Sequence, residues 1–169
     1  QRFDKVIDYA GRVGSGRHSS GKNKTDFKSL SRNGTSLLAY HCEAKHIMRI
    51  RRGLYATIPP TTDAENLVVD AFLIASKAAP DAIIAYYAAL SFHGLAYSSR
   101  QTFTYLTKHK DTNKFTFQGS SYTPVQFPSK LQRKKIVRKE VEETDYRGGF
   151  VSITSVERTI VDCFDKIDL

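Results

Sequence analysis

The stretch TSLLAYHCEAKHIMRIRRGLYATIPP, residues 35–60, decides the fold expected for the first third of the chain. Its first half has the period of a helix that runs to about residue 45. Leu38 and Cys42 lie one turn apart and are expected to face a core together with Leu37. The opposite face of the same helix is expected to carry Ser36, Tyr40 and Glu43.

The second half of this stretch alternates apolar and polar residues, which is the period of a β-strand. Residues 47–50 predict one strand and residues 54–58 predict a second, which Pro59-Pro60 ends. The turn Arg51-Arg52-Gly53 between them predicts a β-hairpin with a basic tip.

The residues upstream complete the pattern. A short helix is expected over 3–10, a Gly- and Ser-rich loop over 11–25, and a second helix over 26–32 that Asn33-Gly34 ends. Two helices joined by a tight turn and followed by a basic hairpin are typical of a winged helix-turn-helix. We therefore expect such a domain over residues 1–60.

The charge is concentrated in the same part of the chain. The whole chain has a net charge of +9, and residues 1–60 contain 12 Lys or Arg and 4 Asp or Glu. Residues 61–169 contain 14 basic and 13 acidic residues and are nearly neutral. A basic excess in one small module favours a polyanionic partner, because each neutralised phosphate releases counterions.

Residues 61–169 predict an α+β domain with a mostly antiparallel sheet. Two capping boxes, Thr62-x-x-Glu65 and Thr154-x-x-Glu157, predict a helix over 62–79 and another from 154 onward. The second of these helices is expected to bury Val156, Ile160, Val161 and Phe164. A short helix over 86–93 is expected to end at Gly94. Strands are expected near 101–107, 114–118, 121–127, 132–139 and 150–153.

Three motifs in order resemble the AbiEi family, the antitoxin and transcriptional regulator of a bacterial abortive-infection toxin–antitoxin system. They are Ile50-Arg-Arg-Gly-Leu-Tyr-Ala56, Ile84-Ala-Tyr-Tyr-Ala-Ala-Leu-Ser-Phe-His-Gly-Leu95 and Thr154-Ser-Val-Glu-Arg-Thr-Ile-Val-Asp162. The resemblance covers roughly residues 26–169. The loop over 11–25 departs from the family pattern, and the stop at Leu169 leaves open that the chain continues.

The resemblance implies an N-terminal domain that binds operator DNA upstream of its own operon and represses transcription. It also implies a neighbouring toxin similar to a nucleotidyltransferase, which the antitoxin counteracts. Neither expectation comes from composition.

DNA contacts are expected from the helix and the hairpin. The third helix is expected to read bases in the major groove with Thr35, Ser36 and Tyr40, while Arg32 and Lys45 lie nearer the backbone. Arg49, Arg51 and Arg52 are expected to meet phosphates or the minor groove. Tyr40 could equally be a half-buried packing residue, and the arginines a solvated turn.

The second domain offers further candidates. A basic run, Arg133, Lys134, Lys135, Arg138 and Lys139, predicts a solvated edge hairpin, with a second nucleic-acid surface as the alternative. His93 is expected to bond backbone carbonyls at a helix end. Arg158 and Asp162 are expected to form an intrahelical ion pair worth a few tenths of a kcal/mol, with a partner surface as the alternative.

The remaining features favour a non-enzymatic protein of the cytoplasm without cofactor or metal. Gly16 to Lys22 matches a phosphate-binding loop, but Asn23 stands where Ser or Thr should hold magnesium. Cys42 and Cys163 are expected to be small core residues, and no apolar run is long enough to span a membrane. Two alternatives stay open: a winged helix that binds RNA or a protein, and a nuclease whose active site lies beyond residue 169.

Overall fold

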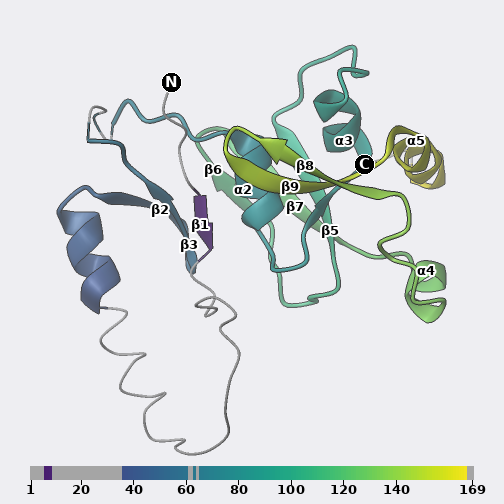
Figure 1. Ribbon diagram of the computed structural model, residues 1–169, viewed down its shortest axis with the longest axis horizontal. Helices are drawn as coiled ribbons and strands as arrows, with labels where there is room; N and C mark the ends of the chain where they lie inside the picture. Colours follow the sequence, from purple (N-terminus) through teal and green to yellow (C-terminus); the bar gives the residue numbers. More distant parts are fainter. Residues whose placement is uncertain (1–5, 9–35, 61–62, 64, 167–169) are drawn as a thin grey trace, which may run out of the picture.

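The computed structural model describes residues 6–8, 36–60, 63 and 65–166, which form two β-sheets and several helices (Figure 1). One sheet has three strands in the order β1-β3-β2, and the other has six in the order β6-β7-β5-β4-β9-β8. The three-stranded sheet and a helix over 36–43 lie at one end of the molecule, and α4 and α5 lie at the other (Figure 1). The described residues are therefore α+β, as the sequence predicts.

The three-stranded sheet contains the predicted hairpin, formed by β2 (Ile47–Arg51) and β3 (Leu54–Thr57). A two-residue turn joins them, and Gly53 in that turn has a φ of +83°, which glycine adopts without strain. The third strand, β1 (Val6–Asp8), pairs antiparallel with the other edge of β3. The helix predicted for 3–10 is therefore wrong over 6–8, where two successive β-branched residues suit an extended chain that β3 can pair.

The six-stranded sheet is mixed. Its strands are β4 (Ile83–Ile84), β5 (Thr102–Thr107), β6 (Phe115–Phe117), β7 (Ser120–Gln126), β8 (Val141–Tyr146) and β9 (Gly149–Thr154). The pairs β4–β5, β6–β7 and β8–β9 are antiparallel, and β4–β9 and β5–β7 are parallel. The expected antiparallel pairing thus holds for three of the five pairs.

Four of the five predicted strands correspond to β5, β6, β7 and β9. The strand predicted over 132–139 is wrong: a short helix, α4 (Ser129–Arg133), and a series of turns occupy this segment. Pro128 at the N-cap favours a helix there, because its φ of −52° suits a helix start. The strand that follows, β8, lies at the edge of the sheet, where its charged residues fit the solvent-exposed position.

The helix predicted over 62–79 starts later than its capping box indicates. The helix that forms there is α2 (Ala71–Lys77), and Asp70 is its N-cap. The Asp70 carboxylate accepts hydrogen bonds from the backbone N–H groups of Phe72 at 2.9 Å and Leu73 at 3.2 Å. Residues 65–70 are not helical, so a downstream aspartate, rather than the Thr62 box, defines the start of the helix.

The two remaining helices follow the sequence more closely. Helix α3 (Tyr86–Phe92) ends at His93, and Gly94 follows with a φ of +73°, as predicted. Helix α5 (Val156–Asp165) has Ser155 as its N-cap, one residue beyond the predicted Thr154. The hydroxyl of Thr154 instead lies 2.7 Å from that of Thr159.

The hairpin and the six-stranded sheet share a core. Ile50, Leu54 and Ala56 of the hairpin belong to the same buried cluster as residues of α2, β4 and β9. Phe72 of α2 contributes edge-to-face contacts with three other aromatic rings, those of Phe92, Phe103 and Tyr146. Because of this shared core, the hairpin is held on one side by the rest of the molecule.

Candidate nucleic-acid interface

The helix over 36–43 presents the face that the sequence predicts for DNA. Ser36, Tyr40 and Glu43 are exposed, and the side chain of Tyr40 is 60% accessible. Leu38 is half-buried, as expected, but Leu37 is exposed rather than in a core. Several predicted features lie outside the described residues. They are two further DNA contacts, Arg32 and Thr35, the helix over 26–32, and the 11–25 loop with its match to a phosphate-binding loop.

The turn after this helix adds a basic residue. Lys45 is exposed and has a φ of +54°, a left-handed conformation that ends the helix and turns the chain toward β2. The Nδ1 atoms of His41 and His46 lie 3.2 Å apart across this turn. Among the described residues no group of three or more His, Cys, Asp or Glu could hold a metal ion.

The three hairpin arginines do not behave alike. Arg49 and Arg52 are exposed, whereas Arg51 is half-buried against the rest of the protein. Residues two apart on a regular strand would point to the same side. The β2–β3 register shifts between Arg49 and Arg51, and such an irregularity redirects the side chain that follows it.

Arg51 is instead bound within the molecule. Its Nη2 donates a hydrogen bond to the carbonyl of Ala78, the residue that caps the C-terminus of α2. Its Cζ lies 4.8 Å from the centre of the Phe115 ring. Burial raises the pKa of the nearby Tyr105 to about 12, and the positive charge of Arg51 opposes part of that rise. Arg51 thus attaches the hairpin to the second sheet rather than projecting from its tip.

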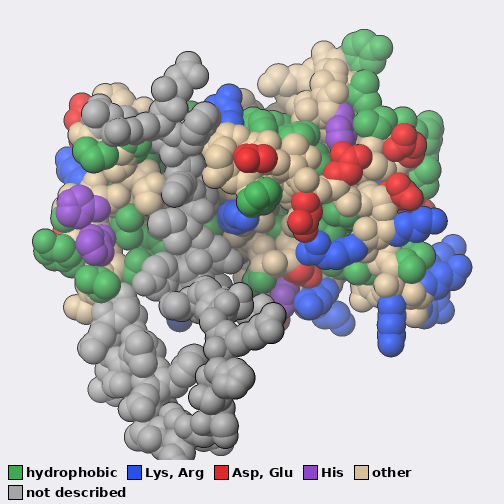
Figure 2. All heavy atoms as spheres, in the orientation of Figure 1, with side chains coloured by type: hydrophobic (Ala, Val, Ile, Leu, Met, Phe, Trp, Pro, Cys, Tyr) green, Lys and Arg blue, Asp and Glu red, His purple; other side chains and the backbone are tan. Residues whose placement is uncertain are grey.

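The predicted second basic surface forms a separate cluster. Arg133, Lys134, Lys135, Arg138 and Lys139 are all exposed, on α4 and the turns after it. They do not form the predicted edge hairpin. Arg138 pairs with Glu143 of β8 at 3.1 Å, and the other cations extend over the end of the molecule far from β2 and β3 (Figures 1 and 2).

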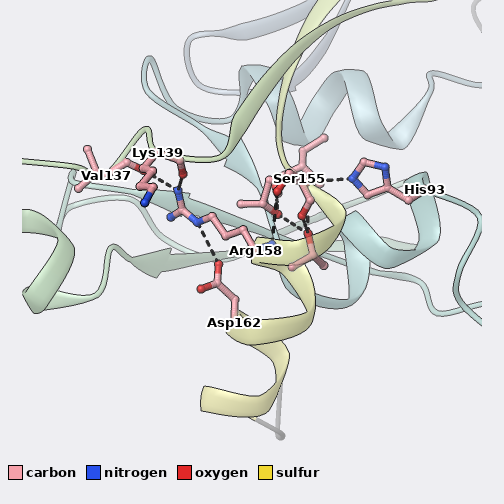
Figure 3. Close-up of polar contacts among 9 residues, drawn as sticks. His93, Val137, Lys139, Ser155, Arg158 and Asp162 are labelled. Atoms are coloured by element: carbon pink, nitrogen blue, oxygen red, sulfur yellow. Dashed lines mark hydrogen bonds and ion pairs between the residues drawn. The ribbon is translucent and has the colours of Figure 1, made fainter.

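His93 has the structural role that the sequence predicts. Its Nε2 lies 2.9 Å from the carbonyl oxygen of Thr154, so the ring donates a hydrogen bond from the end of α3 to the end of β9 (Figure 3). The adjacent turn is closed by the Thr154–Thr159 hydroxyl pair. His93 therefore joins two of the three family-like motifs through a backbone group.

Arg158 and Asp162 do form the predicted i,i+4 pair, with Nε and Oδ2 3.4 Å apart. The pair is not at the surface, since the side chains are only 7% and 11% exposed. Arg158 Nη1 also donates to the carbonyls of Val137 at 2.8 Å and Lys139 at 2.5 Å (Figure 3). The expectation of a few tenths of a kcal/mol is corrected, because removing one partner of a buried charge pair costs far more than breaking an exposed one.

The polar face of α5 faces inward, contrary to the prediction. Ile160, Val161 and Phe164 are exposed, whereas Arg158, Thr159 and Asp162 are buried. Burial raises the pKa of Asp162, and the charge of Arg158 opposes that rise. Both cysteines are free and half-buried.

No family model matches the chain, and no curated protein is similar enough to count as a relative. In the described part of the chain, every helix is too short or too polar to cross a membrane. The division at residue 60 and the family resemblance stay predictions.

Proposed function

We propose that the chain is a DNA-binding transcriptional regulator, and that it acts as autorepressor and antitoxin of an AbiEi-type toxin–antitoxin system. The observation that carries the DNA-binding part is the series of exposed residues from the helix over 36–43 into the β2–β3 hairpin. Within residues 36–60 the exposed cations are Lys45, Arg49 and Arg52. The antitoxin part rests on the three sequence motifs alone.

The proposed mode is that of a winged helix on duplex DNA. The helix enters the major groove, where Ser36 and Tyr40 contact base edges together with Thr35. Arg49 and Arg52 contact phosphates beside the groove, with Lys45 and Arg32 nearer the backbone. Arg51 does not contact DNA in this mode, because its guanidinium is hydrogen-bonded to the carbonyl of Ala78. Its proposed role is to hold the hairpin in position.

Two features support this mode. The sheet order β1-β3-β2 next to a helix is compatible with a winged helix, in which the hairpin is the wing. The inner side of the hairpin is buried in the core through Leu54 and Ala56. The hairpin is therefore held in place while Arg49 and Arg52 face solvent, and a cation on a fixed backbone loses less freedom on binding a phosphate.

A salt titration tests the proposal. Binding of the chain to a duplex from the region upstream of its own gene is measured by fluorescence anisotropy at several salt concentrations. The logarithm of the affinity should fall linearly with the logarithm of salt, with a slope of about −0.9 for each phosphate contacted. In the R49A/R52A double variant the slope should become shallower by about 2.

The matched control is Arg100→Ala, which removes an exposed arginine that packs on Tyr87 away from the hairpin. It should leave the slope unchanged. An unchanged slope in R49A/R52A would contradict the wing assignment, and stronger competition by RNA than by duplex DNA would contradict the DNA proposal. Repression of a reporter fused to the chain's own promoter, and rescue of growth when the adjacent gene is expressed, test the remaining two roles.

A further inference from the structure

Helix α5 carries its apolar residues on the outside. Ile160, Val161 and Phe164 are 42%, 66% and 77% exposed, and their spacing places them in one strip along the helix. Glu157 and Asp165, at either end of this strip, are also exposed. An apolar strip at positions i, i+1 and i+4 of a helix is the pattern by which helices bind another protein surface.

A hollow of about 480 Å³ lies directly beside the strip. Val161 forms one apolar wall, and Leu131 of α4 and Ile136 of the following turn form the other. The hollow is preformed, because buried Arg158 bonds the carbonyls of Val137 and Lys139 and so ties that turn to α5. We define α5 with this hollow and α4 as the terminal face.

The terminal face has opposite charges on its two sides. The α5 side carries Glu157 and Asp165, followed by Lys166 at the end of the helix, and Glu140 and Lys139 both line the hollow. The α4 side carries four exposed cations, Lys130, Arg133, Lys134 and Lys135. In Figure 2 green and red side chains cover the region of α5, and blue side chains cover the adjacent region of α4. Such a face is self-complementary. When a second copy is related to the first by a rotation of 180° about an axis along the hollow, the acidic side of each copy lies on the basic side of the other.

We infer that the terminal face binds a second copy of this chain, with a two-fold axis running along the hollow. In this dimer α5 of each copy rests on α4 of the other, so Val161 and Phe164 meet the partner copy's apolar wall. The acids of each α5 meet the basic residues of the other α4. An isologous interface of this kind uses the same patch twice and closes on itself.

Charge complementarity favours a second copy over the other occupants. A polyanion would be attracted to α4 but repelled by the acids of α5 a short distance away. An unrelated basic protein would match α5 but not α4. A second copy places opposite charges against both α4 and α5, and it also covers the apolar strip. This arrangement therefore avoids like-charge contacts and leaves less apolar area exposed.

The test uses two variants, one that reverses the charge of the α5 side and one that reverses the charge of the α4 side. In either variant alone, the two sides that meet in the dimer have the same sign of charge. E157K/D165K makes both sides of the face basic, and K130E/K134E/K135E makes both sides acidic, because three of the four α4 cations then become glutamates and Arg133 alone remains. The parent should sediment at twice the 19.0 kDa mass of one chain at tens of micromolar. Each of these two variants alone should be monomeric, with dimerisation weakened at least ten-fold. An equimolar mixture should form the heterodimer again, because each α5 then faces an α4 of opposite charge.

Matched controls separate this effect from unfolding. K108E/K110E/K114E changes the charge by the same amount at three exposed lysines elsewhere and should stay dimeric. Val161→Glu should give a monomer, whereas Val68→Glu, at a valine that is 78% exposed, should not. A thermal melt of each variant checks that it is folded.

A monomeric parent at these concentrations, or a mixture that fails to restore the dimer, overturns the inference. A K130E/K134E/K135E variant that loses DNA affinity while the parent is a monomer would assign α4 to nucleic acid instead. The dimer does not depend on the DNA proposal, since the hairpin variants R49A/R52A should dimerise like the parent.

Discussion

The guanidinium of Arg51 in the β2–β3 hairpin donates a hydrogen bond to the carbonyl of Ala78 at the end of α2. The last carbonyls of a helix carry a partial negative charge, so a cation at this position is favourable. The same guanidinium packs on the ring of Phe115 in β6. One residue of the basic hairpin thus connects three elements and belongs to the fold.

Arg51→Ala should therefore destabilise the protein, whereas Arg52→Ala should not. Losing a charged hydrogen bond and a cation–π contact costs about 1–3 kcal/mol, while the exposed Arg52 should change the free energy of unfolding by less than about 0.5 kcal/mol. Urea unfolding monitored by circular dichroism measures both. Equal stabilities of the two variants would show that Arg51 does not attach the hairpin.

The different roles of the three arginines show what the sequence can and cannot predict here. The change of period between residues 45 and 47 correctly predicts the hairpin, because local alternation determines which backbone forms. The direction of Arg51 depends on a register shift in the strand pairing and on an acceptor at Ala78, 27 residues away. Neither the register shift nor the distant acceptor can be predicted from the residues next to Arg51.

Helix α5 shows the same limit more clearly. Its period predicts a helix with an apolar and a polar side, and the helix is present. The carbonyls of Val137 and Lys139 accept hydrogen bonds from Arg158, and these bonds decide which side of the helix is buried. Both carbonyls belong to a turn for which the sequence predicts a strand. Hydrophobicity alone assigns the buried side wrongly, because a long-range polar contact wins over the burial of Val161 and Phe164.

Arg158→Ala should be among the most destabilising substitutions in the second half of the chain. It leaves the carboxylate of Asp162 buried without its cation and two carbonyls without a donor. Breaking a buried pair in this way costs about 3–5 kcal/mol. Arg138→Ala, which breaks an exposed pair with Glu143, should cost at most about 1 kcal/mol. Similar losses in the two variants, measured by urea unfolding, would contradict the buried role of Arg158.

His93→Ala should lower stability without changing DNA binding. The ring donates to the carbonyl of Thr154 across two elements, and the loss of that bond should cost about 0.5–1.5 kcal/mol. Because His93 caps the end of α3 and is not in the hairpin, the affinity for duplex DNA and its salt slope should equal those of the parent. A change of slope in this variant would give His93 a part in binding.

Asp162 should make the stability depend on pH in an unusual direction for an aspartate. Burial raises its pKa above the ordinary 3.8, so the folded state binds the proton more tightly than the unfolded chain. The contribution of Asp162 to the free energy of unfolding is therefore largest below that ordinary value. It falls as pH rises through the raised folded pKa, by about 1.4 kcal/mol for each unit of difference.

Comparison with Asp162→Asn isolates this contribution, since asparagine keeps an acceptor for Arg158 but does not titrate in this range. The free energy of unfolding of the parent, minus that of the variant, should decrease from pH 4 to pH 7. A difference that increases with pH for Asp162 would mean that the pairing with Arg158 outweighs burial, and that Asp162 is a stabilising anion at neutral pH.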